Sequence, residues 1–172
     1  STPDTIFQFD MSTGYDIANA SYSKQGTIDN NGSSADPTPV KIIFNNDGTK
    51  VYITGAANSR VYQFKLTTAY DISTIAPDVS APTQIKNLFL FTHTAYRNGT
   101  QWNHDGTKLF IINGEGASPL AINEYSLTSA YELDTGSYTT SYDISSATGL
   151  VRPEGLHIKP DGTGFHVIDG HK

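Results

Sequence analysis

Hydrophobic and polar positions alternate along the chain in short segments separated by polar turns. The clearest segment starts at residues 40–44, an apolar run bounded by prolines and by Asn-Asn-Asp-Gly, which predicts a buried strand. The Asp-Gly turn that follows predicts a hairpin, so residues 50–54 should run antiparallel to the first strand. Residues 61–66 alternate Val, Gln and Lys with Tyr, Phe and Leu, which predicts a third strand with one packed face and one wetter face. A fourth strand is expected within residues 81–91.

The same pattern returns twice. Residues 44–53 reappear as 102–111 and as 158–167, and Asp-Gly-Thr begins at positions 47, 105 and 161, which are 58 and then 56 residues apart. A fixed period of this size indicates a repeat architecture. The structural turn residues are predicted to be Asp47, Gly48, Asp105, Gly106, Asp161 and Gly162. A calcium loop would spread several oxygen ligands over about twelve residues, so one Asp beside Gly-Thr favours a turn.

Each copy contains, in chain order, a strand, an Asp-Gly turn, a second strand, a loop, a third strand with alternating polarity, a Tyr-Asp-Ile turn and an outer strand. A repeated four-stranded antiparallel unit predicts an all-β fold, a β-propeller with blades of about 57 residues. The chain is interpreted as one domain, 1–172, with repeats at roughly 1–36 (half blade), 37–92, 93–150 and 151–172 (half blade). Helix content should be small.

The two ends read as complementary halves of one blade. The chain begins at a third strand, residues 5–10, and stops after a second strand, residues 165–168. Two interpretations stay open: two chains share a six-bladed ring, or the sequence is a piece of a longer propeller. Either way, unpaired strand edges predict that further blades, from another copy or a longer chain, are partners.

Composition excludes some classes of partner. The formal charge is −6, with eleven Lys plus Arg and no basic run, which argues against nucleic acid. No apolar stretch approaches the roughly 18 residues of a membrane span, so no membrane insertion is expected. The chain has no cysteine, which excludes disulfides and Cys-ligated metals, and no cofactor is predicted. The polar, Cys-free composition favours an extracellular, virion or cell-surface location.

The Asp-Gly-Thr-Lys motif, followed by an aromatic residue and Ile or Val and then by Val-Tyr-Gln-Phe at 61–64, resembles the YVTN and TolB-like (PD40) families of β-propeller repeat. The Leu-Thr-Thr-Ala-Tyr-Asp-Ile-Ser segment at 66–73 looks like the long-repeat variant of phage and marine bacterial surface proteins. The resemblance implies a propeller fold. It leaves the activity open, because propellers of this kind include lactonases, lyases, scaffolds and virion proteins.

The last copy holds the best candidates for chemistry. Arg152, Glu154 and His157 come at the start of a predicted innermost strand, and they are the catalytic candidates. Glu154, His157 and His166 are the metal-ligand candidates. Pro-Glu-Gly-Leu at 153–156 also resembles the strand entry of NHL and gluconolactonase-like propellers. In the alternative interpretation, both histidines are ordinary solvent-facing positions of a hairpin.

Tyrosines at the turns recur once per copy. Tyr15, Tyr70 and Tyr131 could stack on sugar rings, which makes them ligand-stacking candidates. Alternatively, each ring fills the gap between adjacent blades and bonds its hydroxyl to backbone. Recurrence in every copy favours the structural role, because a binding site needs only one copy.

The sequence therefore favours a non-enzymatic structural or recognition module of a phage particle or bacterial surface assembly, with other virion or surface proteins or glycans as further partners. Two alternatives remain. One is a carbohydrate-binding propeller, and the other is a lactonase or lyase-type propeller enzyme with a site in its channel.

Overall fold

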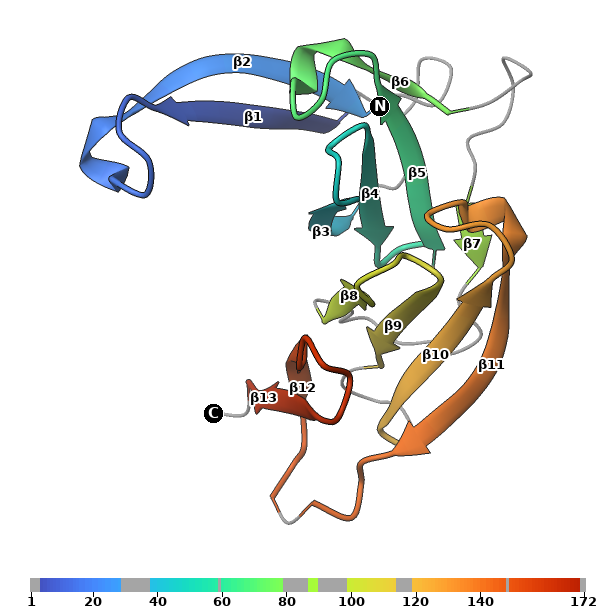
Figure 1. The fold of residues 1–172 in the computed structure, drawn as a ribbon. Coiled ribbons are helices and arrows are strands. Elements are labelled where there is room, and N and C mark those ends of the chain that lie inside the picture. The colour runs from blue at the N-terminus through green and yellow to red at the C-terminus, as the bar shows by residue number, and fades with distance from the viewer. Residues whose placement is uncertain are drawn as a thin grey trace.

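The computed structural model describes residues 4–28, 38–58, 60–78, 87–89, 99–113, 119–147 and 149–170, with the backbone alone at 87–89. These residues form an open arc of antiparallel sheets (Figure 1). The strands are β1 (Asp4–Met11), β2 (Ala20–Ile28), β3 (Pro39–Phe44), β4 (Lys50–Gly55), β5 (Arg60–Leu66), β6 (Ile75–Pro77), β7 (Asn87–Phe89), β8 (Thr100–Trp102), β9 (Lys108–Ile112), β10 (Ala121–Leu127), β11 (Gly136–Asp143), β12 (Pro153–Ile158) and β13 (Phe165–Asp169). The fold is all-β, as predicted.

Helical structure in the described residues is limited to three single 3-10 turns. They are η1 (Ile17–Asn19), η2 (Ile72–Thr74) and η3 (Leu133–Thr135), and each follows the Tyr-Asp or Tyr-Glu pair of its repeat. None of them is long or apolar enough to cross a membrane.

Two complete sheets occupy the middle of the arc. The first has the order β3-β4-β5-β6, and β7 also pairs with β5. The second has the order β8-β9-β10-β11. The prediction of one outer strand within 81–91 is partly wrong, because the outer position of the first sheet begins at Ile75, directly after η2, and is shared by β6 and β7. Residues 79–86 and 90–98 lie outside the described part of the chain.

The two remaining hairpins are half-sheets at opposite ends of the arc (Figure 1). β1 pairs with β2, and β12 pairs with β13. Each described strand of these half-sheets has a single neighbour, and no described sheet closes on itself.

The three Asp-Gly-Thr turns have one geometry. Asp47 Oδ1 accepts a hydrogen bond from the backbone N–H of Thr49 at 2.9 Å, and the other two copies repeat this bond. Gly48, Gly106 and Gly162 have φ of 72°, 73° and 71°, the left-handed region that glycine adopts without steric cost. Hydrogen bonds from the threonines lower the pKa of all three aspartates, because they stabilise the charged form.

Hydrophobic clusters lie between neighbouring sheets. One joins Tyr52 and Val61 of the first complete sheet to Leu109 and Tyr125 of the second. The prediction that Val61 and Gln63 lie on a wetter face of the third strand is wrong, since both are fully buried. The physical reason is that each complete sheet is covered on both faces by its neighbours, so alternation in polarity does not mark an exposed face.

One polar contact between sheets recurs. Gln8 Oε1 on β1 accepts from the Ile72 N–H of the next sheet at 3.0 Å, and Gln63 Oε1 on β5 accepts from the Leu133 N–H at 2.8 Å. Each contact satisfies the first N–H of a 3-10 turn, which has no partner within its own turn. Neighbouring sheets are thus joined at equivalent positions.

Candidate functional site

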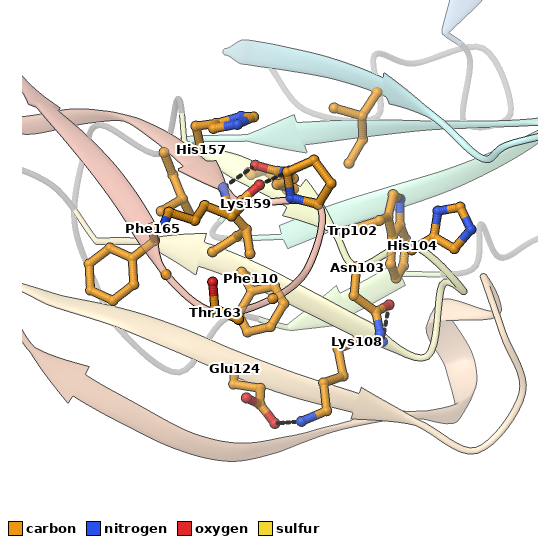
Figure 2. Close-up of a pocket in the computed structure, with 18 of the residues that line it drawn as sticks. Trp102, Asn103, His104, Lys108, Phe110, Glu124, His157, Lys159, Thr163 and Phe165 are labelled. Atoms are coloured by element: carbon orange, nitrogen blue, oxygen red, sulfur yellow. Dashed lines mark hydrogen bonds and ion pairs between the residues drawn. The ribbon is translucent and has the colours of Figure 1, made fainter.

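A groove of about 1090 Å³ lies where the inner strands of three successive sheets meet. It is lined by residues of β3, β8 and β12, by the turns after them, and by Lys108, Phe110 and Glu124 of the second complete sheet (Figure 2). We call it the central groove.

One repeat position supplies a lining residue from each inner strand. Ile43, Gln101 and His157 each lie four residues before the Asp of their turn, and all three line the groove. Gln101 is held in place by β12, because its Oε1 accepts from the Ile158 N–H at 2.8 Å and its Nε2 donates to the Ile158 carbonyl at 3.3 Å. This bond pair ties the inner strands β8 and β12 together at the groove.

The two complete sheets are also connected with each other, through their turns and through β4 and β8. The Asn46 side chain donates to the His104 carbonyl at 2.7 Å, and the hydroxyls of Thr54 and Thr100 lie 3.1 Å apart. These hydrogen bonds hold the neighbouring sheets together where the side chains of the groove project.

The central groove is cationic although the chain is acidic. Its lining includes Lys41, Lys108 and Lys159 against the single carboxylate of Glu124, a formal charge of +2 with histidines neutral. Lys108 Nζ lies 2.8 Å from Glu124 Oε1, so these two groups neutralise one another (Figure 2). Lys41 and Lys159 are exposed, and they supply the net positive charge in a molecule with a formal charge of −6. Such a groove favours an anionic ligand.

The structure separates the three predicted catalytic residues. His157 is exposed in the groove. Arg152 and Glu154 form an ion pair at the start of β12, with Arg152 Nε 2.9 Å from Glu154 Oε1, and neither lines the groove.

The predicted metal ligands form no metal centre in the described structure. His157 and His166 are register partners across the β12–β13 hairpin, and their rings stack with centroids 6.1 Å apart. Glu154 instead takes part in the ion pair with Arg152. Within the described residues, no group of three or more His, Asp or Glu side chains is arranged to hold a metal ion.

Two of the three recurrent tyrosines pack on the turn of their own sheet. The Tyr70 hydroxyl donates to the Asn46 carbonyl at 2.9 Å, and the Tyr131 hydroxyl donates to the His104 carbonyl at 3.2 Å. These hydrogen bonds to backbone carbonyls agree with the structural alternative, in which each tyrosine hydroxyl bonds to backbone. Tyr15 is different, because its side chain is fully exposed. Sugar stacking on these residues stays a prediction.

Sequence reasoning did not single out Lys41, His104 or Lys159 as site residues. A usable signal was present for Lys159, because aligning the three copies on Asp-Gly-Thr places residue 43 with 101 and 157, and residue 45 with 103 and 159. Of these residues, all but the buried Asn45 line the groove. His157 and Lys159 are the charged or ionisable members that only the last copy carries.

No protein-family model and no curated protein sequence matches the chain. Solved structures do match. A candidate 6-phosphogluconolactonase from Bacteroides uniformis is 17% identical with a TM-score of 0.63, and the match covers 97% of this chain and 41% of that one. A candidate 6-phosphogluconolactonase from Bacteroides fragilis is 15% identical with a TM-score of 0.58, covering 96% and 42%. A protein from Lactobacillus plantarum is 15% identical with a TM-score of 0.60, also covering 96% and 42%.

These likenesses concern the fold. The chain resembles β-propeller proteins of the 6-phosphogluconolactonase type over nearly all of its length, and it spans less than half of the structures that it matches. They do not support a viral or surface role.

Proposed function

We propose that the chain forms part of a lactonase-type β-propeller whose central groove binds a phosphorylated sugar lactone. The observation that carries the proposal is the cationic groove in an acidic chain, with Lys41 and Lys159 exposed in it. The names of two structural neighbours support the choice of ligand. The lactonase alternative therefore replaces the non-enzymatic particle module that the sequence favours.

The chemistry asks for a cationic site and a base. A phosphate dianion would be attracted by Lys41 and Lys159, since ammonium groups are ordinary phosphate partners. Water adds to the lactone carbonyl carbon, and the bond between that carbon and the ring oxygen breaks to give a hydroxyl and a carboxylic acid, which releases its proton to solvent and becomes a carboxylate. We assign His157 as the group that takes the proton from the attacking water and returns it to the departing ring oxygen.

Binding can be tested by calorimetry with the hydrolysis product 6-phosphogluconate, using gluconate as the ligand without phosphate. We expect gluconate to bind at least about tenfold more weakly, and the double variant Lys41→Gln/Lys159→Gln to lose a similar factor for 6-phosphogluconate. Lys65→Gln is the matched control, because Lys65 is an exposed lysine on β5 outside the groove. Equal binding of the two ligands, or equal effects of the groove and control variants, would overturn the proposal.

Catalysis is tested separately by titrating the acid released from 6-phosphogluconolactone. His157→Ala should lose hydrolysis above the spontaneous rate and keep binding of 6-phosphogluconate. His166→Ala removes the neighbouring exposed imidazole, which does not line the groove, and should keep activity. An unaltered protein without activity, or equal losses in both variants, would contradict the assignment.

A further inference from the structure

We infer that the phosphate group of the ligand binds at the turn between β12 and β13, where the Lys159 ammonium and the backbone N–H of Gly164 lie together. The choice of a phosphate ester rests on the proposed function, whereas the two donors are features of the turn itself. In the other two copies of the repeat, a side-chain amide occupies the corresponding position. The last copy has no such amide, so a ligand oxygen can take its place.

An asparagine supplies this amide in the first two copies. Asn45 Oδ1 accepts from the Lys50 N–H at 2.9 Å, and Asn45 Nδ2 donates to the Thr49 hydroxyl at 3.3 Å. Asn103 makes the same two bonds in the second copy, at 2.9 and 3.2 Å, and Figure 2 shows the first of them. Each amide therefore provides an acceptor for the backbone N–H that follows the Asp-Gly-Thr turn.

The last copy carries Lys159 in place of this asparagine. The turn keeps its form, because the Gly162 N–H donates to the Lys159 carbonyl at 2.9 Å and Asp161 Oδ1 accepts from the Thr163 N–H at 3.0 Å. A lysine side chain offers donors and no acceptor. Among the described residues, none accepts a hydrogen bond from the N–H of Gly164, the residue that follows this turn.

The Lys159 side chain lies along the backbone of Gly164. A Cβ built on Gly164 would be 3.4 Å from Lys159 Cε and 3.6 Å from its Nζ, which are ordinary contact distances. Gly164 is also not in the left-handed region, so neither crowding nor backbone conformation requires a glycine here, and the other two copies carry lysine at this position. The glycine leaves the backbone open beside the ammonium, which permits the close approach of a ligand.

Two donors therefore meet at the last turn, and one of them is positively charged. Lys159, Thr163 and Gly164 all line the central groove. The carboxylate of this turn, Asp161, accepts from the N–H and the hydroxyl of Thr163 and does not line the groove. An anionic oxygen at this point would accept from the Gly164 N–H, as the asparagine oxygens do in the other copies, and the ammonium would also attract it. The turn therefore favours a phosphate over a neutral part of the sugar.

The assigned position fits the reacting group of the proposed function. His157 lies two residues before Lys159, and both line the groove. Residues two apart in an extended segment are separated by about 7 Å and face the same side, a spacing that one phosphorylated sugar ring can bridge. Lys41 lies four positions before Asn45, the equivalent of Lys159, and so lies nearer the start of its inner strand. We expect Lys41 to add to the attraction of an anion without contacting the phosphate.

Lys159→Asn is the main test, because it restores the residue of the other two copies. The new amide would accept from the Gly164 N–H and donate to the Thr163 hydroxyl, so the midpoint of urea unfolding should rise. The variant also lacks the ammonium and fills the place of the phosphate oxygen, so 6-phosphogluconate should bind at least about tenfold more weakly in calorimetry. Lys159→Met is the matched control, because it removes the ammonium without supplying an amide and should weaken binding without raising the midpoint.

Two results of these titrations would overturn the inference. The first is a Lys159→Asn protein that binds 6-phosphogluconate as tightly as the unaltered chain. The second is a loss in Lys41→Asn as large as the loss in Lys159→Asn. The second result would leave the cationic groove of the proposed function in place.

The Gly164 amide reports the contact directly in a nitrogen–proton correlation spectrum. Titration with inorganic phosphate should move its signal until the site is saturated, and Lys159→Asn should abolish this movement. Gly162 is the internal control, because its N–H already donates to the Lys159 carbonyl and its signal should move less. A Gly164 signal that does not move, or equal movement of both glycines, would overturn the inference.

These measurements separate the phosphate site from the lactonase activity. Movement of the Gly164 signal in a protein that does not hydrolyse 6-phosphogluconolactone would support the phosphate site and contradict the proposed function. Hydrolysis of the lactone with an unmoved Gly164 signal would support the proposed function and overturn the placement of the phosphate at this turn.

Discussion

Gly106 lies at the point where the turn, the recurrent tyrosine and the hydrophobic cluster between the sheets meet. Its φ is +73°, and a Cβ built on it would lie 2.3 Å from the Tyr131 ring. The ring cannot move away freely, because its hydroxyl is bonded to the His104 carbonyl and it packs against Trp102 at a centroid distance of 5.3 Å. Gly106→Ala should therefore carry both a backbone cost and a packing cost.

The left-handed conformation costs a non-glycine residue roughly 1–2 kcal/mol, and overpacking adds about 1–3 kcal/mol, so the free energy of unfolding should fall by roughly 2–5 kcal/mol. Urea denaturation followed by the fluorescence of Trp102, the only tryptophan, measures this directly.

The control is the same substitution in a Tyr131→Ala background. Removal of the ring relieves the crowding, so Gly106→Ala should then cost only the backbone part, about 1–2 kcal/mol. An equal cost in both backgrounds would refute the argument that the tyrosine seals this turn.

Two further predictions concern polar groups. Gln63→Leu leaves the buried Leu133 N–H without its acceptor and should lower the free energy of unfolding by about 1–3 kcal/mol in urea titrations. Gln63→Glu keeps that acceptor but replaces the amide that donates to Asp78 and Glu132 with a third carboxylate, so it should lower the free energy of unfolding by more, and a smaller loss than that of Gln63→Leu would contradict this arrangement. The hydrogen bond from the Thr107 hydroxyl lowers the pKa of Asp105 in the folded protein. The resulting stabilisation of the folded state is complete above the ordinary aspartate pKa of about 3.9, and it is lost as the pH falls through the lower pKa of the folded protein. Thr107→Val should therefore make the urea midpoint less dependent on pH below about pH 4, and an unchanged dependence would show that the hydroxyl does not act on Asp105.

Much of the fold could be predicted from the repeat because its turns are local. Asp47, Gly48 and their equivalents fix a hairpin through their own backbone conformation and hydrogen bonds, so the flanking strands follow from the sequence. The outer strand could not be placed in this way, because β6 and β7 are held only by pairing with β5. The burial of Gln63 could not be predicted either, because Gln63 packs against Leu133, which lies 70 positions away in the sequence.

The candidate site was predictable only in part for a related reason. His157 could be predicted because it belongs to an unusual local motif. Arg152 and Glu154, which were predicted to act with it, pair with each other outside the groove. Lys41 and Lys159 come from different repeats and line the same groove only because the inner strands pack together. Chemistry that is shared among repeats becomes visible when the copies are aligned with one another.

The hydrogen bond that the Leu133 N–H donates to Gln63 Oε1 also bears on how the molecule unfolds. Each sheet supplies the acceptor that holds the 3-10 turn of the sheet after it, so η2 depends on β1 and η3 depends on β5. Each of these two 3-10 turns is therefore stabilised by the sheet that precedes it in the chain. A 3-10 turn that loses the acceptor supplied by the preceding sheet should therefore be a place where fraying starts.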